Sequence, residues 1–398
     1  MITVDHALSI VLDHIESLSV ETTLLEQAHN RILAEDIRAD IDLPPFDRAR
    51  MDGYAVRSAD AGTAPVKLKI IGEIAAGATF DGEVNAGEAV KIFTGAPVPR
   101  GADSVQKVEV TETDGHYVTI KEAVNPGLFV TPHASEVSAG ELVTERGREI
   151  GAAEMAVLAS FGYVRVKVYG RPRIAIISTG SELVDVSIKP TAAQIRNSNS
   201  YTLAAYALGA GAIVDNLGTV EDTPEATRDA LVKAAEGHDM VITSGGVSMG
   251  DYDLVKAALE AIGARIYFDK VSIRPGKPTV FARRNQTYFF GLPGNPVSTS
   301  VTFNVFARPA IRKLQGENLP LLPTVRAVLA RSIKDASNRR SYLPARLFIE
   351  DGRAIVESLK WGGSSDLVAF MRANALIIVR EDMHEIAEGE TVEVLTLD

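Results

Sequence analysis

The sequence contains no cysteine among its 398 residues. Without thiols the protein has no disulfide bonds, thiolate metal sites, iron–sulfur clusters or catalytic cysteine. Basic residues are also fewer than acidic ones. The chain has 41 Lys and Arg and 52 Asp and Glu, which give a formal net charge of −11. Nucleic acids and anionic membrane surfaces bind to cationic faces, so we expect neither as a partner.

Signals for export and for membrane insertion are missing as well. Asp5, Asp13 and Glu16 interrupt the apolar residues near the N-terminus, unlike the apolar core of a signal peptide. The longest stretch without charge, residues 285–307, contains two glycines and two prolines and cannot form a spanning helix. We therefore expect a cytoplasmic protein.

Length and hydrophobic periodicity predict several domains. A chain of 398 residues is long enough for about two to four of them. Apolar residues recur at helical spacing in residues 4–18, and a second helical pattern covers residues 152–160. Between them, residues 66–120 alternate short apolar runs with turn residues. This pattern predicts a small antiparallel β domain inserted into a helical or mixed domain.

The second half of the chain changes character twice. In residues 173–316, apolar runs of strand length alternate with helical stretches, which predicts a parallel, doubly wound α/β domain. Thr223 and Pro224 mark the start of one of these helices, as N-cap and first helical residue. Residues 320–398 return to short alternating strands and predict a small β-barrel or sandwich. The predicted fold class is multidomain α/β.

Three loops rich in glycine and hydroxyl groups follow predicted strands of the α/β domain. They cover residues 178–182, 243–251 and 291–298. Ligands of open α/β sheets bind at the carboxyl ends of the strands, where small residues let backbone N–H groups approach a phosphate. Glycine and serine also end strands for structural reasons alone, but three such loops at one edge favour an anion or nucleotide site. The motifs of dinucleotide dehydrogenases and P-loop NTPases are absent, so both classes are disfavoured.

Acidic and basic residues accompany these loops. Glu182, Asp222 and Asp251 are carboxylates that a phosphate site tolerates when Mg²⁺ lies between them, although Asp222 and Asp251 could equally serve as helix-start residues. Arg274 and Lys277, in the segment RPGKP, form either a solvated turn or a contact for an oxyanion. The polar segment around Asp52 predicts a turn, and the scattered histidines show no zinc-ligand spacing.

Six motifs in order resemble the molybdopterin molybdenumtransferase family, which includes MoeA of bacteria and the matching half of gephyrin in animals. They are MDGYA (51–55), FTGAPVPRGAD (93–103), ISTGSEL (177–183), TSGGVSMGDYD (243–253), RPGKP (274–278) and GLPGNPVS (291–298). The similarity covers essentially the whole chain. It implies an enzyme that inserts molybdenum from molybdate into adenylylated molybdopterin and releases AMP, with Mg²⁺ as cofactor.

The resemblance also implies an architecture. It predicts a segmented N-terminal domain (1–50 and 135–168) and an inserted β domain (51–134). A molybdopterin-binding α/β domain (169–318) and a C-terminal β-barrel (319–398) would follow. The family further implies a homodimer whose cleft is shared between subunits, with a molybdopterin adenylyltransferase as a possible upstream partner.

The catalytic roles are carried over motif by motif. Asp52 and Thr94 would belong to the active cleft reached from the partner subunit. Glu182, Asp222 and Asp251 would hold the metal ion or position the pyrophosphate for cleavage.

The remaining implied residues would bind substrate, cradling phosphate, holding molybdate or shaping the wall of the cleft. Gly245, Gly246 and Ser248 would cradle phosphate, and Pro293 and Pro296 would shape the wall of the cleft. Arg274 and Lys277 would bind molybdate or the ligand's phosphates, and Arg346 and Ser364 would lie at the molybdate end of the cleft. Glu136 stands where the family has an acidic residue, but a neighbouring arginine is missing, which leaves its role open.

Other functions remain compatible with parts of the sequence. The α/β domain also resembles the domain that adenylylates molybdopterin and that of nucleotide deamidase-like proteins, although MDGYA, FTGAP and the C-terminal strands disfavour both. A non-catalytic scaffold of the gephyrin kind would need a linker or second module that this chain lacks. Tungstate has nearly the size and charge of molybdate, so the sequence leaves this preference open.

Overall fold

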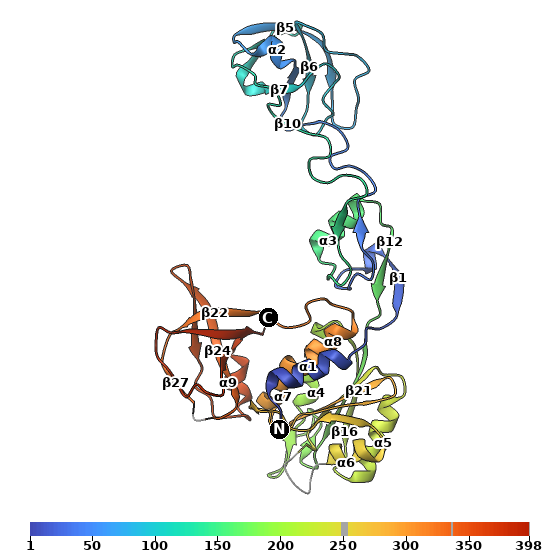
Figure 1. Cartoon of the computed structure of the whole chain (residues 1–398), viewed down its shortest axis with the longest axis vertical. Helices are drawn as coiled ribbons and strands as arrows, with labels where there is room; N and C mark the ends of the chain where they lie inside the picture. The colour runs from blue at the N-terminus through green and yellow to red at the C-terminus, as the bar shows by residue number, and fades with distance from the viewer. Residues whose placement is uncertain (248–253, 336, 398) are drawn as a thin grey trace. The chain divides into compact units, whose positions relative to one another are not determined.

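The chain forms two compact units, which we describe separately. The computed structural model describes residues 1–247, 254–335 and 337–397 (Figure 1). The large unit comprises residues 1–34, 147–151 and 165–398, and the β unit comprises residues 35–146 and 152–164. None of the helices in the described ranges combines the length and apolar character needed to span a bilayer.

The β unit contains a six-stranded sheet with two small apolar clusters against it. The strand order is β7 (Ser104–Lys107), β4 (Gly53–Val56), β6 (Glu88–Ile92), β5 (Val66–Ile74), β9 (Tyr117–Ile120) and β8 (Thr111–Thr113). The prediction of a purely antiparallel domain is wrong at one pair, since β5 and β6 run parallel. The remaining pairs in this sheet are antiparallel.

The chain bends at residues 50–52, as the polar segment around Asp52 predicts, and strand β4 begins at the next residue. All four of its residues are buried, and it pairs with both β6 and β7. A Cβ atom on Gly53 would lie 1.9 Å from the carbonyl oxygen of Gln106, so only glycine allows the two strands to approach. Gly53 therefore begins a buried strand directly after the bend, which the Asp-Gly turn signal did not indicate.

Shorter elements complete the β unit. The helical pattern at 152–160 is confirmed by α3 (Ala152–Ser160). The other elements are β2 (Ile37–Arg38), which pairs with β11 (Leu142–Thr144), β3 (Arg48–Ala49), which pairs with β10 (Val130–Thr131), α2 (Ser58–Ala61) and η2 (Val108–Val110).

The large unit is built around a second six-stranded sheet. Its order is β16 (Ile213–Val220), β13 (Arg173–Thr179), β17 (Met240–Ser244), β21 (Thr287–Leu292), β20 (Val280–Arg284) and β18 (Arg265–Phe268). The first four strands are parallel, which confirms the predicted doubly wound arrangement. The last two pairings, β21–β20 and β20–β18, are antiparallel, a difference that the sequence pattern did not indicate.

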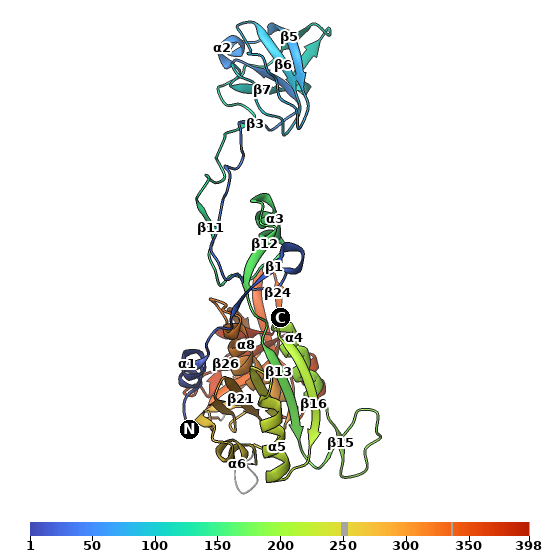
Figure 2. The same ribbon diagram turned by 90° about the vertical axis from the view of Figure 1, so that its right-hand side faces the viewer.

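Helices cover both faces of this sheet, because alternate residues of its buried strands point to opposite sides. Ile174 and Ile176 of β13 pack in one apolar cluster with α1 (Val4–His14), α4 (Asn199–Gly209), α7 (Pro296–Thr302) and α8 (Arg308–Leu314). Ala175 and Ile177 pack in the other cluster with α5 (Pro224–Ala235) and α6 (Leu254–Ala261). Figure 2 shows α4 and α5 beside β13 and β16.

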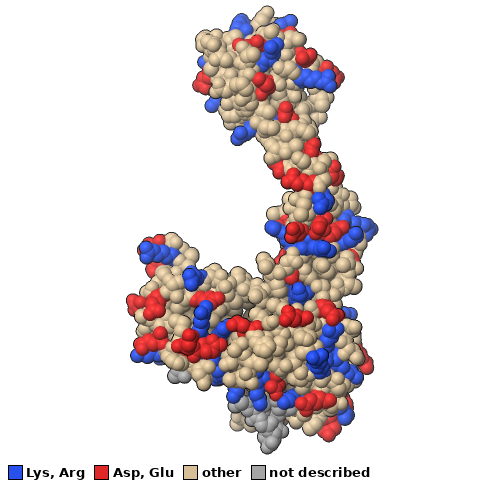
Figure 3. Space-filling model, in the orientation of Figure 1, with Lys and Arg blue, Asp and Glu red and all other residues tan. Residues whose placement is uncertain are grey.

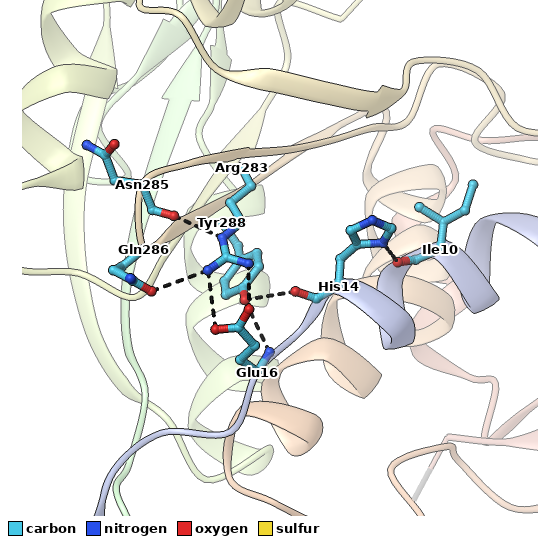
Figure 4. A network of polar contacts seen from close by, with 7 residues as sticks. All are labelled: Ile10, His14, Glu16, Arg283, Asn285, Gln286 and Tyr288. Atoms are coloured by element: carbon cyan, nitrogen blue, oxygen red, sulfur yellow. Dashed lines mark hydrogen bonds and ion pairs between the residues drawn. The ribbon is translucent and has the colours of Figure 1, made fainter.

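The helix predicted at the N-terminus is confirmed but ends at His14, and it belongs to the core of the large unit. Its end is held by polar contacts shown in Figure 4. The Tyr288 hydroxyl donates to the His14 carbonyl oxygen (2.9 Å) and accepts from the Glu16 N–H (3.1 Å). Arg283 pairs with the Glu16 carboxylate at 3.0 Å. The N-terminal segment is thereby fixed against the strand pair β20–β21.

The C-terminal part of the large unit is a closed β-barrel, as the short alternating strands indicated. The sheet order is β24 (Arg340–Glu350), β25 (Arg353–Ser358), β22 (Thr324–Leu329), β28 (Thr391–Thr396) and β26 (Ala375–Val379), and β26 pairs back with β24. The two-residue strand β19 (Ile273–Arg274), which ends at the first residue of the RPGKP segment, joins this sheet beside β24. This segment is therefore shared between the α/β domain and the barrel.

The remaining elements of the large unit are short. Three strand pairs are β1 (Val20–Leu24) with β12 (Arg165–Tyr169), β14 (Leu183–Val184) with β15 (Ile195–Arg196), and β23 (Ile333–Lys334) with β27 (Glu385–Ile386). The helical elements are η1 (Leu25–Gln27), the π-helical turn η3 (Phe303–Ala307) and α9 (Leu367–Met371).

Candidate active site

The three glycine-rich loops meet at one edge of the parallel sheet. Gly245 donates its N–H to the carbonyl oxygen of Leu292 (3.1 Å), which joins the ends of β17 and β21. The Asn199 amide donates to the Ser244 hydroxyl and to the Gly294 carbonyl oxygen, both at 2.7 Å. The start of α4 thus holds two of the loops together, a role for Asn199 that sequence reasoning missed.

Glycine is required at positions 245 and 246 because of the backbone conformation there and because neighbouring atoms lie too close for a side chain. Their φ angles are +91° and +64°, and a Cβ on Gly245 would lie 2.3 Å from the Thr179 carbonyl oxygen. A Cβ on Gly246 would lie 2.7 Å from the Thr179 hydroxyl oxygen. The glycines therefore let two strand ends pack closely, whatever ligand they hold, and Ser248 lies outside the described residues.

Two of the three predicted acids come together at this edge, and we call Glu182 and Asp222 the acidic edge. Partial burial of the carboxyl group, and secondly the negative charge of Glu182, raise the pKa of Asp222. The third acid, Asp251, lies outside the described residues. Among the described residues, no three His, Asp or Glu side chains lie close enough to hold a metal ion. Two neighbouring carboxylates nevertheless fit Mg²⁺, which takes one or two carboxylates and keeps several waters.

A cavity of about 1360 Å³ lies in the large unit, lined by the RPGKP segment and the barrel. We call it the basic cavity, because its described lining residues include six cations and one acid, Asp335. The cations are Arg274, Lys277, Arg331, Lys334, Arg339 and Lys360. On the face drawn in Figure 3, by contrast, basic side chains are interspersed with acidic ones.

The cavity cations differ in their partners. Arg274 pairs with Asp335, Arg331 with Glu357 (3.1 Å) and Lys334 with Glu385 (3.2 Å). Within the described part of the chain, Lys277 and Lys360 have no acidic partner. These two charges remain available to an anion in the cavity.

Residues 291–298 connect the glycine loops with the basic cavity. A Cβ on Gly294 would lie 3.5 Å from the Cα atom of Gly245. The next residue, Asn295, donates its amide to the Ser364 hydroxyl at 2.9 Å, and the Val297 N–H donates to the Ser364 carbonyl oxygen at 3.0 Å. Ser364 lines the cavity. Residues 291–298 therefore contact both the strand-end loop at Gly245 and Ser364 of the cavity wall.

Three further predicted residues occupy distinct places. Pro293 follows β21 and is buried, while Pro296 is the first residue of α7. Arg346 is exposed on β24, opposite Glu357, and is not among the described residues that line the basic cavity. Arg339, seven residues earlier, does line it. The adjacent arginines in the sequence NRRSY were the available signal for this residue.

Asp52 and Thr94 meet in the β unit. The Thr94 N–H and hydroxyl both donate to one carboxylate oxygen of Asp52, at 2.7 and 2.8 Å. These two hydrogen bonds, the backbone one first, lower the pKa of Asp52. The exposed Glu136 lies in the same unit, 3.5 Å from Arg48.

Family models match three consecutive regions of the chain. Residues 2–162 match the MoeA N-terminal region (domain I and II), residues 175–313 match a probable molybdopterin binding domain, and residues 326–397 match the MoeA C-terminal region (domain IV).

Relatives of known name match over the full length. The molybdopterin molybdenumtransferase of Haemophilus influenzae is 35% identical, with 99% of this chain and 98% of the relative covered. That of Bacillus subtilis is 34% identical, with 100% and 94% covered. A crystal structure of the molybdopterin biosynthesis MoeA protein from Pyrococcus horikoshii superposes with a TM-score of 0.84 at 29% identity and covers 100% of both chains.

Proposed function

The chain belongs to the molybdopterin molybdenumtransferase family, and on this premise we propose that it transfers molybdenum from molybdate to adenylylated molybdopterin with release of AMP. The observation that carries this proposal is the basic cavity joined to the strand-end loops through residues 291–298. An oxyanion and a phosphorylated ligand can occupy neighbouring parts of such a surface. The adenylyltransferase and scaffold alternatives are not favoured, because relatives that match the whole chain are named as molybdenumtransferases.

Molybdate would occupy the basic cavity. Lys277 has a free charge, Arg274 keeps part of its side chain exposed, and Ser364 offers a hydroxyl. A tetrahedral dianion needs several donors from different directions, and charge-assisted hydrogen bonds are the strongest that side chains offer. The net charge of the protein is −11, so this local excess of cations is what would attract an anion.

The phosphates of the adenylylated substrate would lie at the glycine loops, beside the acidic edge. Glu182 and Asp222 would hold Mg²⁺ there, with Asp251 as a third candidate ligand. When bound, Mg²⁺ would supply neutralisation of the charge that develops on the phosphate being cleaved. The protein's own part is to orient the pyrophosphate by backbone N–H groups, with AMP as the leaving group.

A shared cleft in a homodimer remains part of the proposal. The hydrogen bonds from Thr94 keep Asp52 ionised, as a residue that binds a cation or orients a substrate group requires. In a shared cleft, Asp52 of one subunit would act with the acidic edge of the other. Mixed Asp52→Asn and Asp222→Asn proteins would then recover part of the activity through heterodimers, and a lack of recovery despite subunit exchange would contradict sharing.

The function is tested by AMP release from adenylylated molybdopterin with and without molybdate. We expect release that depends on molybdate in the wild type and is lost in Lys277→Met. Such a substrate would come from a molybdopterin adenylyltransferase. Consumption of ATP with free molybdopterin, without any molybdate requirement, would instead support an adenylyltransferase and overturn the proposal.

A further inference from the structure

Asp335 is the one acidic residue among the described residues that line the basic cavity. Its side chain is 3% exposed. One carboxylate oxygen accepts from the Arg274 guanidinium and from the Ser337 N–H (3.1 Å). The other oxygen has no hydrogen-bond partner among the described residues. A buried carboxylate in an anion site lowers the attraction for the anion, so its presence needs a physical reason.

The barrel fixes the position of Asp335. Its N–H donates to the His384 carbonyl oxygen (2.8 Å), and the His384 ring nitrogen Nδ1 lies 3.2 Å from the Asp335 carbonyl oxygen. The preceding residue, Lys334, pairs with Glu385 in the β23–β27 ladder. The backbone that carries the Asp335 carboxylate is therefore fixed by its contacts with residues 384 and 385.

The backbone of Arg274 is held by the same barrel, but its side chain is only partly engaged. Arg339 donates to the Ile273 carbonyl oxygen at 3.0 Å, and β19 pairs with β24. The Arg274 side chain is 42% exposed, although its partner Asp335 is almost fully buried. A guanidinium has five N–H donors in a planar fork, so the contact with Asp335 leaves others free.

We infer that Asp335 is a positioning residue, which holds the Arg274 guanidinium with its free N–H groups directed toward the oxyanion in the basic cavity. This inference rests on the proposed function. Asp335 touches no substrate and acts through Arg274. An arginine anchored at one end loses less conformational freedom when the other end binds an anion, so the anchor raises affinity.

A simple electrostatic role predicts the opposite result. If Asp335 were only a negative charge near the anion, Asp335→Asn would make molybdate bind more tightly. If it positions Arg274, the same change replaces a charge-assisted hydrogen bond by one about half as strong, and molybdate binds more weakly. The direction of the change therefore separates the two roles.

The experiment is a molybdate titration followed by tryptophan fluorescence. Trp361 is the single tryptophan of the chain and lines the basic cavity. We expect Asp335→Asn to raise the Kd by about fivefold to tenfold, since an anchoring hydrogen bond is weakened. In an Arg274→Gln background the same change should have no further effect, because residues that act through one another are not additive.

AMP release provides a second test, because a purely structural role of Asp335 would not change the KM for molybdate selectively. In AMP release, Asp335→Asn should raise the KM for molybdate and leave the KM for adenylylated molybdopterin unchanged. Asp335→Glu keeps the negative charge but displaces it, so this variant should also weaken molybdate binding. It replaces Asp335→Asn in the test if the Asn variant does not fold.

Unchanged or tighter binding in Asp335→Asn, or an equal effect with and without Arg274, would overturn the inference alone. A wild-type protein that neither binds molybdate nor releases AMP would overturn the proposed function, and the inference with it.

Discussion

The acidic edge and the basic cavity lie in the same unit and differ in the sign of their charge. At the acidic edge, partial burial and a neighbouring carboxylate raise the pKa of Asp222, so its ionised form is less favoured than that of an ordinary aspartate. In the basic cavity, Lys277 and Lys360 lack acidic partners among the described residues, so an anion relieves the repulsion between cations. Under the proposed function, the acidic edge would bind a metal ion and the basic cavity would bind an oxyanion.

The largest predicted effect tests the acidic edge. Magnesium that binds only the folded protein should stabilise it by about 2.7 kcal/mol at 100 times its Kd. Asp222→Asn should lose most of this gain, and should be at least as stable as the wild type in EDTA because it removes a partly buried charge beside Glu182. Thermal unfolding with and without Mg²⁺ measures both effects.

The matched control is Glu221→Gln, which removes a neighbouring exposed acid. This variant should keep the full response to magnesium. If Asp222→Asn also kept it, the acidic edge would not be a metal site.

The next effect tests the basic cavity. Lys277→Met should raise the Kd for molybdate about 10- to 100-fold, because a hydrogen bond to a charged group is worth roughly 1.5–3 kcal/mol. Lys334→Met is the control, since Lys334 is 79% exposed and already paired with Glu385. Exposed pairs contribute about 0–1 kcal/mol, so we expect at most about a fivefold change. Equal losses in both variants, measured by Trp361 fluorescence, would mean that no specific anion site exists there.

A smaller effect concerns pH. A carboxyl group whose pKa is raised in the folded state contributes stability that is present below its ordinary value of 3.8 and is lost as pH rises through the raised pKa. Without metal, the wild type should therefore gain stability relative to Asp222→Asn as pH falls through this range. The magnesium response should decline over the same range, because protonated Asp222 cannot bind a cation. Urea unfolding at several pH values checks the sign, and a difference independent of pH would contradict it.

The smallest predicted effect concerns Asp52 of the β unit, whose pKa is shifted in the opposite direction from that of Asp222. Hydrogen bonds from Thr94 lower the pKa of Asp52. Thr94→Val removes the hydroxyl but keeps the backbone N–H, so the pKa of Asp52 should rise and remain below its ordinary value. Carboxyl-carbon NMR titration measures this shift, and Thr94→Ser should leave it nearly unchanged. No change in Thr94→Val would show that the hydroxyl does not hold the carboxylate.

Much of the fold could be predicted because local signals and burial agreed. Strand β13 and helix α5 lie where apolar periodicity, the Thr223 N-cap and Pro224 predicted them. Strand β4 could not be predicted, because the Asp-Gly pair at its start is a turn signal for the bend before it, and only the close approach of Gln106 makes glycine necessary at position 53. The antiparallel strands β18 and β20 were likewise missed, since short apolar runs carry no information on direction.

The site was predictable only where motifs marked it. Arg274 and Lys277, which line the basic cavity, could be named as candidates from their Pro-Gly turn, and Asp222, beside Glu182, from its place after a strand. Arg339, Lys360 and Asp335 were not found, because they lie far along the chain and reach the cavity only when β19 pairs with β24 and the barrel closes. Such assembly by long-range strand pairing leaves no local pattern in the sequence.

The most direct test of the account is the position of the oxyanion itself. Crystals soaked with molybdate would locate the metal by anomalous scattering. The account predicts a single strong peak in the basic cavity, within hydrogen-bonding distance of Lys277, Arg274 and Ser364. A peak elsewhere on the protein, with this cavity empty in crystals of active enzyme, would contradict it.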